Sequence, residues 1–177
     1  MYEEKINAYF DAPERRAELV EAISRLVRIR SVREEPLPGM PFGPGPAAAL
    51  AEGLKLAEEL GFATRNYDNY VGTADLNDKE TALHILCHLD VVGEGTGWTV
   101  TEPYAPKEVD GMLYGRGTDD DKGPAVLSLY AGAYLLKHGI VPRYTFRALL
   151  GCIFFCLGFL LYFCLQRLLR NGNLLLL

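Results

Sequence analysis

The chain has 177 residues, of which 49% are hydrophobic, and a formal net charge of −5. This length suffices for one domain with a hydrophobic core, or for part of a larger one, and is short for two. Lysine and arginine form no dense block, so nucleic acid is not an expected partner. The acidic start, Met1 to Lys5, lacks the basic and apolar regions of a secretory signal, which predicts a cytoplasmic location.

The four cysteines form no CxxC pair. Cys87 stands alone, whereas Cys152, Cys156 and Cys164 lie in one apolar run. We therefore expect free thiols in a reducing compartment rather than disulfides or a zinc knot.

Two helices are predicted in the first third of the chain. Asp11 and Glu14 have the spacing of a capping box, and apolar residues then recur at helical period to about Arg30. Residues 36–46 contain five prolines and three glycines, which predicts a loop. A second helix follows and ends near Gly61, because glycine tolerates the positive φ of a helix end.

Strand-like segments follow the second helix. Asn69–Leu76 and Thr81–Cys87 are separated by four polar residues, which predicts a β-hairpin. A long loop from Gly93 to Gly117 contains one short strand-like stretch, Met112–Tyr114. His88 directly follows the second strand of the expected hairpin.

The next elements indicate the fold class. A helix is predicted over Pro124–Lys137, closed by Gly139, and a strand over Arg143–Leu150. Strand, loop, helix and strand in this order predict an α/β fold, with a mixed, mainly parallel sheet flanked by helices. Ligands of such sheets gather at the carboxyl ends of strands, and His88 lies at such an end.

His88 and Asp90 form the first candidate site. In extended backbone, residues two apart point to the same face, so one metal ion could interact with both side chains. A neutral imidazole is a common metal ligand, and a neighbouring carboxylate can fix its tautomer. An isolated His-x-Asp pair is more often structural than metal-binding.

The second candidate site is the acidic cluster Asp119-Asp120-Asp121, which lies between glycines in Gly115–Gly123. Three adjacent carboxylates repel one another, so they are either held together by a cation or left in water, and solvation alone is the more frequent case. Lys122-Gly123 reverses the order that a phosphate-binding P-loop needs. The spaced acids of an EF-hand are also missing.

Taken together, the two clusters resemble a known family. The stretches H-L-D-V-V from His88, G-W at Gly97, and Y-G-R-G-T-D-D-D-K-G-P from Tyr114 resemble the M20 metallopeptidases, in particular their PepV-like and Sapep-like dipeptidase branch. The resemblance covers roughly residues 5–151. It implies the amino-terminal part of a dinuclear metallopeptidase catalytic domain, with a phosphorylase/hydrolase-like fold.

The resemblance implies roles for the acidic and histidine residues. His88 would be a metal ligand, and Asp90 would be the catalytic-site carboxylate that orients it. Asp120 would bridge two divalent metal ions (zinc, or manganese or cobalt), and its peptide bond to Asp121 would be cis. Asp119 would be solvated.

The remaining polar residues near these clusters are expected to be structural. Arg116 and Lys122 would brace the loop together with Asp121, by pairing with its acids. His84 lies inside a strand and His138 near a helix end, where a histidine suits the helix dipole.

The chain departs from the family pattern after its last predicted strand. Relatives carry a Gly-x-x-Glu-Glu segment that supplies the general base and a further ligand, whereas this chain has Phe154 and Phe155 there. After Arg147 it contains no Asp, Glu, His or Lys. The resemblance implies hydrolysis of a dipeptide or short peptide by a water that bridges two metal ions. The missing base predicts that this chain itself is inactive.

Residues 152–177 are expected to be a separate, aberrant apolar tail after a partial catalytic domain at 1–151. From Ala148 to Leu165 there is no charged residue. One hypothesis is a reading frame shifted near Gly151. The alternative is a membrane anchor on a non-catalytic, M20-like protein that binds metal or peptide, with membrane association through residues 148–165.

Overall fold

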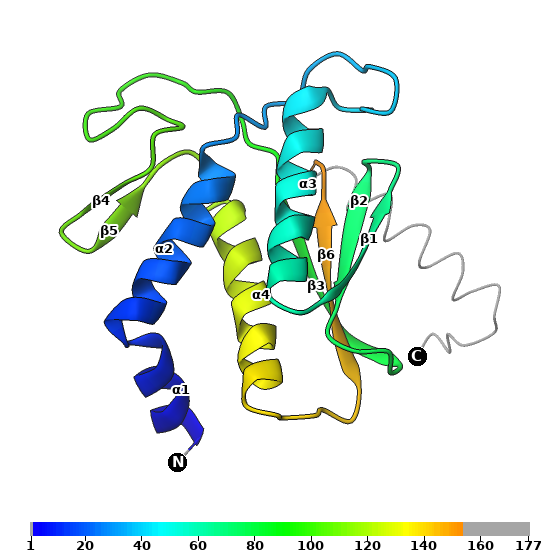
Figure 1. Cartoon of the computed structure of the whole chain (residues 1–177). Coiled ribbons are helices and arrows are strands. Elements are labelled where there is room, and N and C mark those ends of the chain that lie inside the picture. The colour runs from blue at the N-terminus through cyan, green and yellow to red at the C-terminus, as the bar shows by residue number, and fades with distance from the viewer. Residues whose placement is uncertain (1, 154–177) are drawn as a thin grey trace, which may run out of the picture.

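The computed structural model describes residues 2–153, and within them four helices and a four-stranded sheet form an α/β fold (Figure 1). The predictions for Phe154, Phe155 and the tail lie outside the described residues. The helices are α1 Tyr2–Phe10, α2 Pro13–Val27, α3 Pro44–Glu59 and α4 Lys122–Lys137. The strands are β1 Ala63–Tyr67, β2 Val71–Asp75, β3 Thr81–His88, β4 Lys107–Val109, β5 Met112–Tyr114 and β6 Thr145–Gly151.

The main sheet has the strand order β1-β2-β6-β3. Strand β6 pairs in parallel with β3 and antiparallel with β2, and β2 pairs antiparallel with β1. The mixed α/β fold is thus confirmed. The expectation of a mainly parallel sheet is wrong for the described strands, because strand–helix–strand order describes only β3, α4 and β6.

The predicted hairpin is also wrong, because β6 lies between its two strands. The Thr145 N–H donates to the Glu80 carbonyl, and the Leu76 N–H donates to the Phe146 carbonyl. The start of β6 is therefore hydrogen-bonded to both ends of the connection from β2 to β3. Short local spacing predicted a hairpin, but the pairing partner lies more than sixty residues later along the chain.

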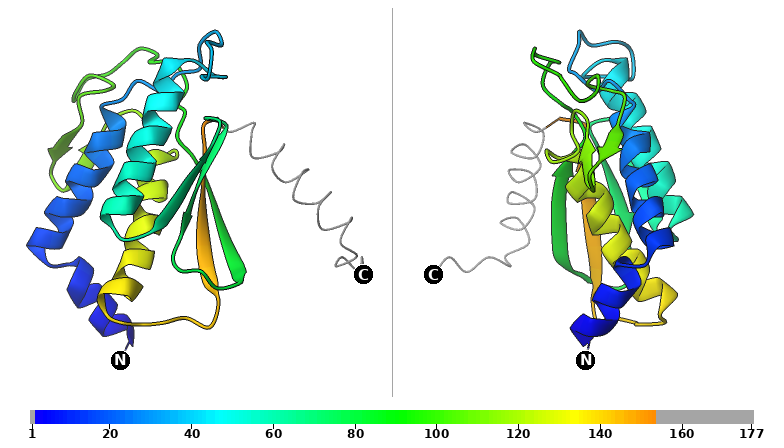
Figure 2. Two further views of the ribbon diagram at one scale, coloured as in Figure 1. Left: turned by 45° about the vertical axis from the view of Figure 1, so that its right-hand side comes forward. Right: turned by 90° about the vertical axis from the view of Figure 1, so that its left-hand side faces the viewer.

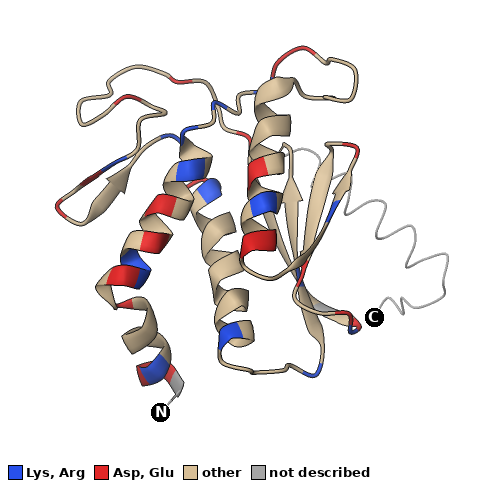
Figure 3. Cartoon of the chain, in the orientation of Figure 1, with Lys and Arg blue, Asp and Glu red and all other residues tan. Residues whose placement is uncertain are grey.

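Helices α2, α3 and α4 lie on one face of the sheet (Figure 2). Helices α3 and α4 contact the strands, and α2 packs across both helices. Leucines from all three helices and from the sheet fill the space between them: Leu26, Leu50, Leu54, Leu129 and Leu150. Helix α4 packs against both α2 and the sheet, and it carries charge only at its two ends, as Figure 3 shows.

The predicted helices are confirmed, with different starts. Helix α2 begins at Pro13, and Ala12 occupies its N-cap without a side-chain hydrogen bond, so the Asp11 capping box is wrong. Proline is preorganised for the first helical position, which also explains why α3 begins at Pro44, inside the predicted loop. Gly61 follows α3 with φ of 94°, as expected.

Two of the four cysteines lie within the described residues. Cys87 is a free, buried thiol, and Cys152 is buried with its Sγ 3.3 Å from the Pro46 carbonyl oxygen, while Cys156 and Cys164 lie outside the described residues. Within residues 2–153, no helix combines the length and the apolar character that crossing a bilayer requires.

Candidate metal site

The candidate site lies at the carboxyl end of the parallel strand pair. His88 is the last residue of β3 and is opposite Gly151, the last residue of β6. The loop 115–121 runs past this end and leads into α4. The topology therefore brings both sequence clusters to one edge of the sheet, where ligands of α/β folds bind.

His88 lies between two carboxylates. Its Nδ1 is 3.1 Å from Asp90 Oδ1, and its Nε2 is 3.0 Å from Asp120 Oδ1. Because an ionised carboxylate can only accept, the Nδ1–H donates to Asp90 and directs Nε2 toward Asp120. The orientation that a metal ligand needs is thus built into the β3 terminus.

The electrostatics of His88 reflect the same contacts. The hydrogen bond to Asp90 raises the pKa of His88 to about 9, against the opposing effect of burial, with a further contribution from the charges of Asp120 and Asp121. A protonated His88 bridges the carboxylates. A divalent cation at Nε2 would take the place of that proton, and the Asp120 side chain, 83% exposed, is open to the same cation.

Asp121 holds the backbone rather than the imidazole. Its Oδ2 accepts the His88 N–H at 3.0 Å, and the residue occupies the N-cap position of α4. Burial raises the pKa of Asp121. The Asp120–Asp121 peptide is cis, as the resemblance implied, and the two neighbouring carboxylates contact different parts of His88. Asp119 is exposed, in agreement with its expected solvation.

Lys122 and Arg116 do not pair with the acidic cluster, which corrects the predicted ion pairs with its carboxylates. Among the residues that the structure describes, Lys122 is the one charged side chain that is fully buried, and its Nζ donates to the carbonyls of Leu26 and Ile29 at 2.8 and 2.7 Å. These carbonyls lie at the end of α2, where a cation is favourable. Arg116 donates to the Glu94 carbonyl at 3.0 Å. Both residues brace the site through carbonyl groups.

Replacing Lys122 by alanine is expected to destabilise the fold by about 2 kcal/mol. The variant loses two charge-assisted hydrogen bonds, about 1.5–3 kcal/mol each, and a buried methylene stem. Relief of desolvation offsets part of this loss, because burial lowers the pKa of Lys122 to about 8, equivalent to about 3 kcal/mol against the charged form.

Chemical denaturation measures this effect. The matched control is Lys79→Ala, since the Lys79 Nζ also donates to a carbonyl, that of Pro142, but on the surface. We expect a change below about 0.5 kcal/mol for the control. Equal midpoints for the two variants would contradict the bracing role of Lys122.

Ser31 is a site residue that the sequence did not reveal. It is fully buried after α2, its Oγ donates to the Leu89 carbonyl at 2.6 Å, and its carbonyl accepts the Val91 N–H at 3.1 Å. These two bonds flank Asp90 and hold it beside His88. No local pattern marks this serine, because its partners lie about sixty residues away.

The end of β3 and loop 115–120 line a cavity of about 500 Å³, which includes His88, Asp90 and Asp120 among its lining residues. This volume lies within the range of small-molecule sites. His84 is exposed on β3. The His138 ring packs against the Tyr134 ring, with 4.3 Å between the ring centres. Within residues 2–153, no group of three or more His, Cys, Asp and Glu is arranged to hold a metal ion, so the described site offers the pair His88 and Asp120.

An imidazole oriented by one carboxylate toward another, at the carboxyl end of parallel strands, is typical of an α/β metallohydrolase. Comparison with known proteins narrows this class. Residues 84–152 match the model of peptidase family M20/M25/M40. The chain belongs to the M20 peptidases.

Relatives and solved structures agree with this assignment. The chain is 38% identical over 119 residues to "Putative dipeptidase YtjP" of Bacillus subtilis, and this match covers 66% of this chain and 26% of the relative. It is 37% identical over 153 residues to "Putative dipeptidase SSP1012" of Staphylococcus saprophyticus, with 85% and 31% covered. Human carnosine dipeptidase 1 superposes with a TM-score of 0.70 at 27% identity, with 84% and 34% covered.

A more distant structure supports the fold alone. The M20 family metallo-carboxypeptidase Sso-CP2 of Sulfolobus solfataricus gives a TM-score of 0.61 at 20% identity and covers 76% of this chain and 30% of its own. The chain thus spans between a quarter and a third of the length of the curated relatives described above.

Proposed function

We propose that this chain supplies the His88–Asp120 part of the dinuclear metal site of a dipeptidase, in a partial catalytic domain at residues 1–151. The observation that carries the proposal is the row Asp90–His88–Asp120, with the imidazole held between the two carboxylates. Two divalent ions, zinc or else manganese or cobalt, would supply an activated water and polarise the scissile carbonyl when bound. A dipeptide or short peptide is the proposed substrate, by analogy with the named relatives.

The residues of this chain have distinct roles in that site. His88 Nε2 and the Asp120 carboxylate would contact metal, and Asp90 would hold the Nδ1 proton so that Nε2 stays a ligand. Asp121 and Ser31 fix the backbone on both sides of the imidazole. None of these groups is placed to take the proton of a nucleophilic water and pass it to a leaving amine, which peptide hydrolysis requires.

We therefore propose that the 177-residue chain binds a divalent ion weakly and does not hydrolyse dipeptides. A two-ligand site is open, since structural and catalytic zinc sites use three or four protein ligands. Phe154 and Phe155 stand where the resemblance implies the glutamate pair. Metal-dependent turnover of a dipeptide by the purified chain would contradict the second half of this proposal.

Calorimetric titration with zinc or manganese tests the first half. We expect His88→Ala to abolish binding and Asp90→Ala to weaken it by about 10–100-fold, because loss of the carboxylate that orients a ligating histidine has effects of this size. The matched control is His84→Ala on the same strand, which is exposed and away from the cavity. A loss of binding in the control equal to that in His88→Ala would refute the assignment.

A further inference from the structure

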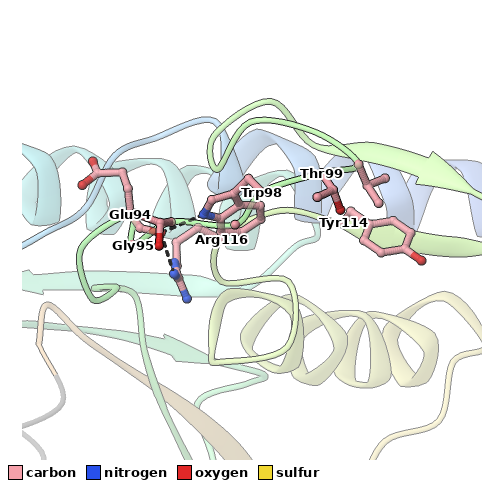
Figure 4. A pocket seen from close by; sticks show the side chains of 9 residues that line it. Glu94, Gly95, Trp98, Thr99, Tyr114 and Arg116 are labelled. Atoms are coloured by element: carbon pink, nitrogen blue, oxygen red, sulfur yellow. Dashed lines mark hydrogen bonds between the residues drawn. The ribbon is translucent and has the colours of Figure 1, made fainter.

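We infer that Arg116 is a positioning residue, which with Trp98 and the Glu94 carbonyl fixes the loop that carries Asp120. This inference rests on the proposed metal site. Figure 4 shows the three residues, with the Arg116 side chain beside the Trp98 indole and both directed at the same carbonyl oxygen. We use the term carbonyl clamp for Glu94, Trp98 and Arg116.

The clamp is built from one acceptor and two donors. The Glu94 carbonyl oxygen accepts the Trp98 Nε1–H at 2.7 Å and an Arg116 Nη2–H at 3.0 Å. The Arg116 guanidinium also lies 5.2 Å from the centre of the Trp98 ring, within the range of a cation–π interaction. Its Nε is buried and has no acceptor within the described part of the chain. The guanidinium is therefore held by a ring and a carbonyl rather than by an acid.

The backbone of Arg116 is fixed to the same loop. Its N–H donates to the Pro103 carbonyl at 2.7 Å, so both the main chain and the side chain of Arg116 contact loop 93–106. The Glu94 carboxylate in turn accepts from Arg30 Nε at 2.5 Å, next to Ser31. Loop 93–106 thus connects the segment that follows α2 to the start of loop 115–120, which carries Asp120.

This arrangement matters for Asp120, which follows Arg116 by four residues. Arg116 lines the same cavity as His88 and Asp120, yet its charge is engaged by the clamp. The Asp120 carboxylate consequently remains exposed and available to a cation. Without the clamp, loop 115–120 loses its side-chain anchor and keeps the main-chain hydrogen bond to Pro103, and a released guanidinium on the cavity rim would compete with the metal for carboxylate oxygen.

Trp98 allows a direct test, because it is the only tryptophan of the chain. We expect zinc to change the fluorescence of Trp98 in the unmodified 177-residue chain. In Arg116→Met, zinc affinity by calorimetry should fall about tenfold, the lower limit for loss of a group that orients a ligand. The Trp98 emission of that variant should no longer respond to zinc.

Two further variants complete the test. Arg116→Lys keeps the positive charge but lacks the planar guanidinium, so it cannot contact the Trp98 ring and the Glu94 carbonyl at the same time. We expect its zinc affinity to lie between those of the unmodified chain and Arg116→Met. This variant decides the matter if Arg116→Met does not fold. The matched control is Arg143→Met, which removes an exposed arginine at the same 5.2 Å from a ring, that of Tyr144, and should leave both readouts unchanged.

The outcomes separate this inference from the proposed function. If the unmodified chain binds no zinc, the proposed function fails first. If the unmodified chain binds zinc, and Arg116→Met binds it equally well with the same Trp98 response, Arg116 has no positioning role. Arg116→Lys is judged in the same way if Arg116→Met does not fold. A loss of affinity in Arg143→Met as large as in Arg116→Met would also overturn the inference.

Discussion

Gly123→Ala is expected to lower the free energy of unfolding by about 3 kcal/mol and to abolish metal binding. A Cβ at this position would lie 1.9 Å from the Thr118 carbonyl oxygen and 3.0 Å from its carbon. Both atoms belong to the backbone, so no side chain can move aside, and overpacking of this kind costs about 1–3 kcal/mol or more. The Gly123 N–H also donates to the Gly117 carbonyl at 3.2 Å, so the clash falls on the loop that contains Asp120.

Denaturant unfolding and zinc calorimetry measure the two effects of Gly123→Ala. The matched control is Gly93→Ala, because a Cβ at Gly93 meets no heavy atom within 4 Å. The control should change stability by less than about 0.5 kcal/mol. If Gly123→Ala keeps the stability and metal affinity of the unmodified chain, that result would contradict the close packing of Thr118 against the start of α4.

Leu89→Ala is expected to lower the free energy of unfolding by about 2–5 kcal/mol, the range for truncation of a buried leucine. Leu89 has no exposed surface and points into the core, opposite to its neighbours His88 and Asp90. A Cβ on Gly53 of α3 would lie 3.0 Å from Leu89 Cδ1, which shows how closely the helix packs on it. The cavity would also loosen the segment that positions the imidazole, so weaker metal binding should accompany the loss of stability.

Leu83→Ala is the matched control for Leu89→Ala. Leu83 lies in β3, a few residues before Leu89, but is 56% exposed. Its truncation removes little buried surface and should cost less than about 1 kcal/mol. A similar loss of stability in both variants, followed by thermal or chemical unfolding, would contradict the assignment of Leu89 to the core.

The fold could be predicted where its determinants are local. The helical period and the terminal glycine indicated α3, and the proline near the start of α4 indicated that helix. Strands β1 and β4 were missed, because each is short and largely exposed. The position of β6 between β2 and β3 depends on pairing over a long sequence separation, which no local spacing encodes.

The same distinction holds for the candidate site. His88 and Asp90 are two residues apart, so a strand geometry alone places them together, and the contact with Asp120 followed from the family resemblance. The partners of Lys122 and Arg116 were predicted wrongly, because nearby acids in the sequence suggested ion pairs. Lys122 instead reaches α2, more than ninety residues earlier in the chain, and Arg116 reaches Glu94.

We expect His88 to bind a divalent ion through Nε2 while Asp90 holds the Nδ1 proton. A long-range ¹H–¹⁵N correlation spectrum of the imidazoles tests it directly, because the chain contains three histidines. On addition of zinc, we predict that His88 shows a protonated Nδ1 and a zinc-shifted Nε2, with His84 and His138 unchanged. An unchanged His88, or a zinc-shifted Nδ1 on that residue, would show that His88 Nε2 does not bind the ion.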